Sequence, residues 1–196
     1  MTDTAGRRVS GSAQSKRDDI LGAAEDAFAV RGFRGAPMAD IAAAAGLTQQ
    51  GVLHYFASKK HLLLAVLERR EDTDIERVSK YEGSYLDALL ELCRHNAERP
   101  GLIRLFVTLS AESTDPENPG HLWFQHRYSN MRNLIAGALR QDQQAGLLAA
   151  ALDADALSVQ LIALFDGLQL QWLLAPDEVD MVSAMESFIA LVRTAS

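Results

Sequence analysis

The chain has 196 residues and a formal net charge of −7, a length that fits one large domain or two small ones. Hydrophobic residues make up 48% of it and charged residues 23%, as in folded globular proteins, which excludes a wholly disordered chain. Cys93 is the only cysteine, so an intrachain disulfide and a Cys-rich zinc site are excluded. Apolar runs reach six residues, as in residues 62–67, too few for a membrane span. No apolar segment follows Arg7 and Arg8, so we expect no secretory signal and a cytoplasmic location.

Charge is divided unevenly along the chain. Residues 1–70 carry ten Lys or Arg and seven Asp or Glu, a balance of +3, whereas residues 71–196 carry nine and nineteen, a balance of −10. Such an asymmetry indicates different partners for the two parts. The first part can meet a polyanion such as DNA, and the second would be repelled by one.

Helical periodicity runs through the whole sequence. Ala and Leu are abundant and apolar residues recur with a period near 3.6, which predicts an all-α chain. We expect the first helix to begin near Ser15, because residues 15–18 have the form of a capping box, and to end at Gly32. Pro37 suits the first position of a second helix, which stops at Gly46.

Polar residues that begin helices place the later elements. We expect Thr48 to cap a short third helix over residues 49–55, and Ser58 to cap a fourth that runs without interruption over residues 59–80. Asp153 and Asp177 are the expected caps of the last two helices. The helices predicted after the fourth cover residues 84–97, 100–112, 119–145, 153–174 and 177–194.

Residues 38–55 combine a helix, a glycine turn and a short helix, which is the arrangement of a helix-turn-helix DNA reader. Gly46 permits a turn conformation that other residues adopt only at a cost. Thr48 would expose the N–H groups at the start of the second helix, which favour a phosphate. Gln49 and Gln50 stand on its first turn, where a glutamine amide can pair with adenine in the major groove.

The order and spacing of these pieces resemble the N-terminal domain of the tetracycline-repressor (TetR) family of bacterial regulators over residues 16–63. The matching residues are Ile20-Leu21, Ala23-Ala24, Phe28, Gly32-Phe33, Ile41-Ala42, Ala45-Gly46-Leu47-Thr48, Leu53-His54-Tyr55-Phe56, Ser58-Lys59 and Leu62-Leu63. Asp166-Gly167-Leu168 also looks like a frequent family feature of the penultimate helix. The resemblance implies a three-helix helix-turn-helix domain over residues 1–58. A long fourth helix would join it to a helical effector-binding and dimerisation domain over residues 59–196.

Three features depart from the family pattern near the reading helix. Ala36 and Pro37 stand where a hydroxyl residue usually precedes the second helix, so we expect its cap to be weaker or made otherwise. Gln50-Gly51 replaces the usual pair of small residues, and Leu53 stands where many members carry Tyr. These changes leave the predicted fold intact and bear on the operator sequence.

By this resemblance, the DNA-binding residues lie on or beside the third helix. Gln49, Gln50 and Gly51 would face base edges, whereas His54 and Tyr55 would lie near phosphates, and Lys59 would contact a phosphate as a point charge. The candidates for DNA binding are Thr48, Gln49, Gln50, Gly51, His54, Tyr55 and Lys59. An N-terminal basic arm would follow the DNA backbone or enter the minor groove, with a solvated tail as the alternative. The arm comprises Arg7, Arg8, Lys16 and Arg17.

The helix expected over residues 153–174 is apolar on more than one side, so we expect both sides to be buried. A second copy of the chain would cover one side, as the family resemblance also implies, and the alternative is a monomeric core. Which apolar side faces the partner stays open. The predicted dimer residues are Leu157, Leu161, Leu164, Leu168, Trp172, Met181, Met185 and Phe188. A twofold dimer would present two reading helices to a palindromic operator.

The family layout implies that the middle helices enclose an effector pocket. The candidate lining residues are Leu90, Phe106, Trp123, Tyr128, Phe165 and Gln169. Their character predicts a mostly apolar or aromatic effector, while plain core packing is the alternative for each of them. Arg127 and Arg132 can anchor an acid, although a solvated helix face explains them more simply. A bound effector would push the fourth helix and so change the spacing of the reading helices.

Other functional classes have less support. The histidines are scattered, and no P-loop or dinucleotide-binding glycine motif occurs, so we predict neither an enzyme nor a bound metal or cofactor. A dimeric small-molecule-binding protein without specific DNA binding is the main alternative. The prediction is therefore a homodimeric regulator, a repressor of a double-stranded DNA operator that a small molecule releases. An activator is the alternative to a repressor, because the sequence does not decide the sign of regulation. The operator sequence, the regulated genes, and the identity and existence of an effector are left open.

Overall fold

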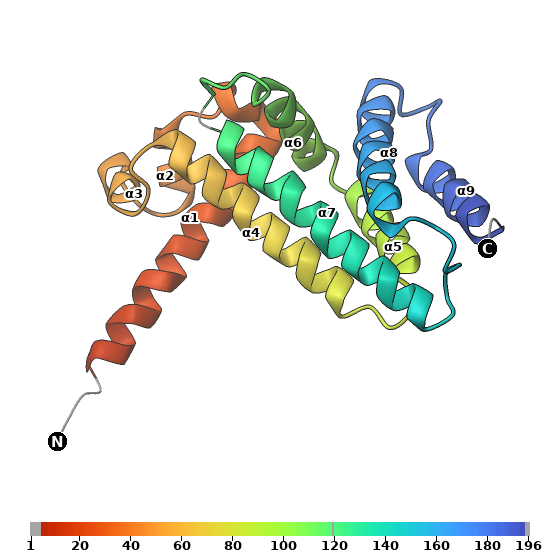
Figure 1. The fold of residues 1–196 in the computed structure, drawn as a ribbon. Helices are drawn as coiled ribbons and strands as arrows, with labels where there is room; N and C mark the ends of the chain where they lie inside the picture. Colours follow the sequence, from red (N-terminus) through yellow and green to blue (C-terminus); the bar gives the residue numbers. More distant parts are fainter. Residues whose placement is uncertain (1–4, 119, 195–196) are drawn as a thin grey trace. The chain divides into compact units, whose positions relative to one another are not determined.

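The computed structural model describes residues 5–118 and 120–194, with side chains described from residue 13 to residue 193. Over these residues the chain forms nine α-helices and no strand (Figure 1), as the sequence predicts. The helices are α1 (Ala5–Gly35), α2 (Met38–Ala44), α3 (Gln49–Tyr55), α4 (Lys59–Ser79), α5 (Tyr85–Ala97), α6 (Pro100–Glu112), α7 (His121–Gln144), α8 (Ala154–Leu174) and α9 (Met181–Thr194). The chain divides into two compact units, residues 1–70 and residues 71–196. Helix α4 runs through the division, so its first half belongs to unit 1, and the functional boundary at 58/59 remains a prediction.

Helix α1 begins well before the predicted start at Ser15. It is already helical at Ala5, so the capping-box prediction is wrong. No proline interrupts the preceding residues, and the polar side chains of the supposed box pair along a continuing helix. The Lys16 ammonium lies 3.4 Å from a carboxylate oxygen of Asp19, a spacing of three residues that suits neighbours on one helix face. The break expected at Gly32 is present, with a φ of 69° at that residue.

Unit 1 is built around the turn between α2 and α3. Pro37 is the N-cap of α2, not its first residue, and no side chain caps this helix. Gly46 has a φ of 67°, which costs a residue with a Cβ about 1 kcal/mol or more. Its N–H donates to the carbonyl of Ala43 at 3.1 Å, and the N–H of Leu47 donates to that of Ala42 at 2.8 Å. These two hydrogen bonds end α2 and direct the chain toward the start of α3.

The buried residues of unit 1 come from all four of its helices. Ile20 and Phe28 of α1, Ile41 of α2, Val52 of α3 and Leu62 of α4 are each at most 1% exposed. Helix α2 packs against both α1 and α3, so α3 is held by its buried side while its other side stays in solvent. The sequence pattern of the resemblance therefore corresponds to a packed core.

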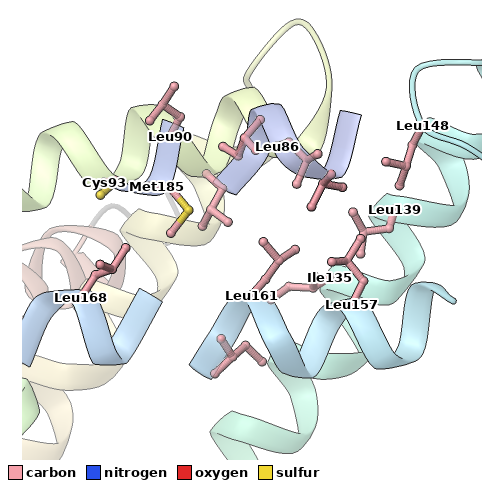
Figure 2. Packing of buried hydrophobic residues seen from close by; sticks show 14 of the residues in the cluster. Leu86, Leu90, Cys93, Ile135, Leu139, Leu148, Leu157, Leu161, Leu168 and Met185 are labelled. Carbon is pink, nitrogen blue, oxygen red and sulfur yellow. The ribbon is translucent and has the colours of Figure 1, made fainter. Parts of the chain in front are cut away.

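Unit 2 has one large core, which α5, α7, α8 and α9 share. Figure 2 shows its side chains meeting from these helices, among them Leu86, Leu139, Leu161 and Met185. Helix α8 packs against α6, α7 and α9, and α5 packs against α7 and α9. Asp153 caps α8 as predicted, since its carboxylate accepts the N–H of Ala156 at 3.2 Å.

The start of α9 differs from its prediction. The helix begins at Met181, and the carboxylate of Asp180 accepts the N–H groups of Val182 and Ser183 at 2.9 and 3.1 Å. Asp177 therefore does not cap the helix. Asp180 stands directly before the first helical residue and accepts from the first turn, which is the position a capping carboxylate needs.

By length and composition alone, α8 could cross a membrane, and it is the one described helix for which this holds. That is weak support for a span, because the core helix of a globular protein passes the same test. Leu157, Leu161 and Leu168 of α8 are buried in the core of unit 2. We therefore interpret α8 as a core helix.

Candidate functional site

The helix α3 presents the predicted DNA-reading residues on its exposed side. The Thr48 hydroxyl accepts the N–H of Gly51 at 3.1 Å, which confirms Thr48 as the N-cap. Gln49, Gln50 and His54 are exposed, whereas Val52 of the same helix is buried. The carboxamides of Gln49 and Gln50 therefore stand in solvent beside the free N–H groups of a helix start, the arrangement that suits a phosphate and adjacent base edges.

Gly51 and Tyr55 are only partly exposed. A Cβ at position 51 would lie 3.4 Å from the Thr48 hydroxyl and 3.6 Å from the Leu47 Cβ, which are ordinary contact distances, so the packing of α3 does not itself require a glycine there. The Tyr55 ring meets the His54 ring edge-on, with centroids 5.7 Å apart. The two rings form one aromatic edge at the end of α3.

Lys59 lies at the start of α4 and is held within unit 1. Its ammonium sits 4.9 Å from the centre of the Phe33 ring and donates to the carbonyl of Arg34 at 3.4 Å. Partial burial lowers the pKa of Lys59 from its usual value. Ser58 caps α4, since its hydroxyl accepts the N–H of His61 at 3.3 Å. The lysine is thus positioned by unit 1, and its contact with a phosphate remains a prediction.

The basic arm divides into two parts. Lys16 pairs with Asp19, and the guanidinium of Arg17 lies 5.1 Å from the centre of the Phe56 ring. Arg17 therefore packs against the surface of unit 1, whereas Lys16 is exposed and pairs only within α1. Arg7 and Arg8 lie on the helical backbone of α1, and their side chains are outside the described residues.

The predicted effector residues fall into two groups. Leu90 belongs to the buried core of unit 2, and Phe165 packs against that core. Phe106, Trp123 and Tyr128 instead surround Phe124, whose ring centre lies 5.3, 4.8 and 6.3 Å from theirs. The buried Phe124, which the sequence analysis left out, thus joins three of the predicted residues.

Helix α8 carries two polar residues with little exposure, the predicted Gln169 and its neighbour Asp166. Gln169 is 4% exposed, so little of its side chain reaches solvent. One turn earlier, the carboxylate of Asp166 accepts the Tyr128 hydroxyl at 2.7 Å. Burial raises the pKa of Asp166, against the opposing effects of the Tyr128 hydrogen bond and the charge of Arg127. Burial and the nearby Asp166 also raise the pKa of Tyr128.

Arg127 is only slightly exposed and packs against aromatic rings, so its interpretation as part of a solvated face is wrong. Its side chain is 15% exposed, and its guanidinium carbon lies 4.4 Å from the centre of the Phe106 ring and 5.5 Å from that of Tyr128. Its Nε lies 3.6 Å from a carboxylate oxygen of Glu71. Arg132, by contrast, is exposed. A signal existed in the sequence, because Arg127 falls three residues after Phe124 and four before Met131, inside an apolar helix face.

Five of the eight predicted dimer residues are buried inside one chain. These are Leu157, Leu161, Leu168, Met181 and Met185, all members of the core of unit 2. Side chains of the same chain cover these five residues, and their contact with a partner remains a prediction. Leu164, Trp172 and Phe188 are partly exposed. The apolar period of α8 and α9 thus includes the side of these helices that packs in the core of unit 2.

Exposed apolar residues mark another side of the same two helices. They are Val159, Leu170 and Leu174 on α8 and Leu191 on α9. Together with the exposed Ala163, the α8 residues recur at spacings of four, seven and four, which places them along one side of the helix. This side, which we call the outer apolar face, is the surface available to a second copy.

Side chains of metal-binding types and the single cysteine lie among the described residues. No cluster of three or more His, Cys, Asp or Glu side chains that could hold a metal occurs among them. Cys93 is buried, and its thiol points to the carbonyl of Met181 at 3.6 Å. Burial raises the pKa of this thiol to about 11, so the reactive thiolate is scarce at neutral pH.

Helix α3 follows a turn at Gly46 and is capped by Thr48, and unit 2 is a separate helical unit. These features define an all-α helix-turn-helix protein of two units. Comparisons with known proteins extend this. Residues 20–66 match the model of the tetR family of bacterial regulatory proteins, and residues 84–194 match that of the C-terminal domain of BetI-type transcriptional repressors. The chain belongs to the TetR family, and it is a DNA-binding transcriptional regulator.

Individual relatives agree with this assignment along most of the chain. The regulator TtgR of Pseudomonas putida is 31% identical over 193 residues, which cover 93% of this chain and 92% of TtgR. A TetR-family regulator from Rhodococcus sp. superimposes with a TM-score of 0.75 at 27% identity, over 92% of this chain and 99% of that one. A transcriptional regulator from Saccharomonospora viridis, solved in complex with choline, has a TM-score of 0.74 at 28% identity, over 90% and 96%.

Proposed function

We propose that this TetR-family regulator is a cytoplasmic repressor that binds a palindromic operator as a homodimer and leaves it when a small molecule binds unit 2. It would have no enzymatic activity. The observation that carries the DNA-reading part is the start of α3, where Thr48 holds the first turn and Gln49 and Gln50 project into solvent. Base edges would be read by these two amides. Lys59 and the His54–Tyr55 edge would contact phosphates.

The outer apolar face supports the homodimer. A face formed by Val159, Leu170 and Leu174 exposes large apolar side chains along one helix, which in a water-soluble domain marks a contact surface. A twofold partner would cover it with the same residues of its own α8. Two copies of α3 would then read two half-sites, and neither copy alone would give much affinity.

Unit 2 supplies the sensor in this proposal. The polar groups buried between its helices, Arg127, Tyr128 and Asp166, would bind an effector together with the aromatic rings around Phe124. Helix α4 carries Lys59 at its start and Glu71 beyond the division between the units. Because the helix is continuous, a displacement of the part that carries Glu71 would also move the part that carries Lys59. The effector shifts the operator equilibrium only by its differential affinity for the two states.

The choline bound by the Saccharomonospora viridis regulator makes a quaternary ammonium compound one candidate effector here. A cation of this kind binds over aromatic faces. In this chain Arg127 already covers the rings of Phe106 and Tyr128. A second cation would have to displace the guanidinium, so this candidate has little support from the residues themselves.

Selection of bound duplexes from a random DNA pool, at a salt concentration near physiological, tests the reader. We expect one palindromic motif, and we expect the protein to migrate as a dimer during size-exclusion chromatography with light scattering. Recovery of no motif, with weak binding that salt abolishes, would overturn the operator proposal. The protein would then be a dimeric small-molecule-binding protein without specific DNA binding.

A further inference from the structure

The guanidinium of Arg127 is a buried cation whose hydrogen bonds are incomplete. Its Nε and Nη1 are both inaccessible to solvent, and neither has a hydrogen-bond partner among the described residues. Glu71 lies near Nε, but at 3.6 Å the pair is an ion pair without a hydrogen bond. Buried N–H groups of a charged side chain are almost always satisfied by protein, water or ligand. Arg127 therefore has donor capacity that an oxygen-bearing group can still fill.

The groups around Arg127 indicate the charge of that missing partner. Phe106 and Tyr128 present ring faces to the guanidinium, which hold it by a cation–π contact but accept no strong hydrogen bond. The carboxylate of Asp166 accepts the Tyr128 hydroxyl at 2.7 Å, and burial raises its pKa. The lasting positive charge in the cluster is that of Arg127, which stays protonated in proteins. The two N–H groups of Arg127 that have no partner among the described residues need an acceptor, which a ligand carboxylate has and a quaternary ammonium group lacks.

Glu71 occupies the place that such an anion would take. Its side chain is 21% exposed and that of Arg127 is 15% exposed, so the pair reaches solvent at one edge. A ligand carboxylate can approach from that edge, and a planar carboxylate matches the guanidinium fork with two parallel hydrogen bonds. The rings of Phe106 and Tyr128 would receive the apolar part of the same molecule.

We propose that the effector is a small aromatic or aliphatic carboxylic acid whose carboxylate replaces Glu71 at Arg127. This inference rests on the proposed effector-dependent function and names the chemical class of the effector. It also names the switching contact. Glu71 lies on α4, the helix that leads to the DNA reader, and Arg127 lies on α7, which holds the sensor. Replacement of Glu71 by the ligand carboxylate at Arg127 would therefore remove one ion pair between these two helices.

Binding of matched probes to the full-length protein tests the chemistry. The probes are benzoate, naphthalene-2-carboxylate and octanoate, each against its own neutral amide, with benzyltrimethylammonium as a cation, and isothermal titration calorimetry gives the affinities. We expect at least one acid to bind about tenfold or more tightly than its amide, because a charge-assisted hydrogen bond exceeds a neutral one. Equal binding of acid and amide, binding by the cation alone, or no binding by any acid would each overturn the proposal.

Two variants locate the effect, each with a matched control. Arg127→Met should reduce acid binding to the level of the amide, and Arg132→Met, five residues further along α7 and exposed, should leave the preference unchanged. Glu71→Gln should tighten acid binding several-fold because the competing charge is gone, whereas Glu68→Gln on the exposed side of α4 should not. Acid binding by Arg127→Met is compared with that of the parent protein once matching circular dichroism spectra show that the variant folds. Glu71→Gln tests the same contact in a protein that keeps the guanidinium. Weaker acid binding by Glu71→Gln would contradict the exchange.

Operator affinity, measured with and without the bound acid, separates this inference from the proposed function. In the parent protein the acid should weaken binding to the selected duplex, and in Glu71→Gln the acid should change it less, because that ion pair is already absent. Coupling between two ligands is reciprocal, so the operator should weaken acid binding by the same factor by which the acid weakens operator binding, and this factor should be smaller in Glu71→Gln. Intact operator binding that no acid alters would overturn the effector class alone. Loss of operator binding by every form of the protein would instead refute the DNA-binding proposal.

Discussion

The reading surface of α3 and the buried cluster around Arg127 are built in opposite ways. The residues of the reading surface follow one another in the sequence, from Thr48 to Tyr55, and their polar side chains project from one short helix. The Arg127 cluster draws single residues from four helices, with Glu71 on α4, Phe106 on α6, Tyr128 on α7 and Asp166 on α8. The reading surface needs only a core that holds α3 in place, whereas the Arg127 cluster forms only when the helices of unit 2 are packed together.

This difference predicts how each region responds to substitution. A change on the exposed side of α3 alters recognition and leaves the core untouched. A change in unit 2 alters packing first, and any change of function follows from that. The following substitutions test the contrast, beginning with the largest expected effect.

Leu161→Ala should be the most damaging of these substitutions. The side chain is 1% exposed and belongs to the core that α5, α7, α8 and α9 share (Figure 2). Removal of a buried leucine side chain costs about 2–5 kcal/mol, depending on how far the cavity collapses. Urea denaturation measures the loss in the free energy of unfolding.

Leu134→Ala is the matched control, because the same atoms are removed from an exposed position on α7. Its free energy of unfolding should change by less than about 0.5 kcal/mol. Equal losses for the two variants would show that Leu161 is not the core residue described here.

The case of Leu161 also shows what the sequence could and could not predict in unit 2. Helical periodicity placed α8 to within a residue, because Asp153 caps it and apolar residues recur along it. The same periodicity could not tell which apolar side faces the chain's own core, since both sides are apolar. Burial of Leu157 and exposure of Leu170 depend on where α7 and α9 lie, and that is a property of the packed unit.

In unit 1 the sequence was the better guide. Gly46, Thr48 and Ser58 act through bonds to residues three or four positions away, so their roles were visible in the local order. The start of α1 was the exception, since a pattern that suits a cap also suits pairing within a helix. The low exposure of Arg127, which the sequence analysis named as a possible anchor for an acid, was not expected, because a charged residue is usually exposed and only its neighbours on the helix face indicated otherwise.

Gln49→Ala should have the second largest effect, on recognition and not on stability. A bidentate glutamine–adenine pair is worth about 1–3 kcal/mol of discrimination, or roughly 5-fold to 150-fold. Titration of the selected operator and of duplexes changed at single positions should show a loss confined to one base pair per half-site. The variant should unfold like the parent protein, because Gln49 is exposed.

Gln125→Ala, at an exposed position on α7, is the control for that substitution and should bind every duplex as the parent does. A Gln49→Ala variant that lost affinity equally for all duplexes would place Gln49 on the phosphates. The reading surface would then be shifted toward Gln50 and His54.

Thr48→Ala should have a moderate effect on the stability of unit 1. The hydroxyl accepts the N–H of Gly51 at 3.1 Å, and the loss of such a cap costs about 0.5–2 kcal/mol. Thr48→Ser keeps an acceptor in the same place and should recover most of the loss. Urea denaturation compares the two variants, and equal losses for alanine and serine would show that the methyl group of Thr48 matters more than its hydroxyl.

The smallest effect should come from the ion pair of Arg31 with Asp40, which joins α1 to the first turn of α2. The guanidinium donates to the Asp40 carboxylate, and both side chains are 50% exposed. Asp40 also lies near the positive end of α2, so its single substitution removes two effects at once. A double-mutant cycle with Arg31→Ala and Asp40→Asn isolates the pair itself. Water screens exposed pairs, so the coupling should be about 0.2–1 kcal/mol. It should also shrink in 1 M salt, where the screening length falls to about 3 Å. A coupling energy that 1 M salt does not reduce would mean that the Arg31–Asp40 pair is shielded from solvent. The surface of unit 1 would then hold a shielded ion pair, as the Arg127 cluster does.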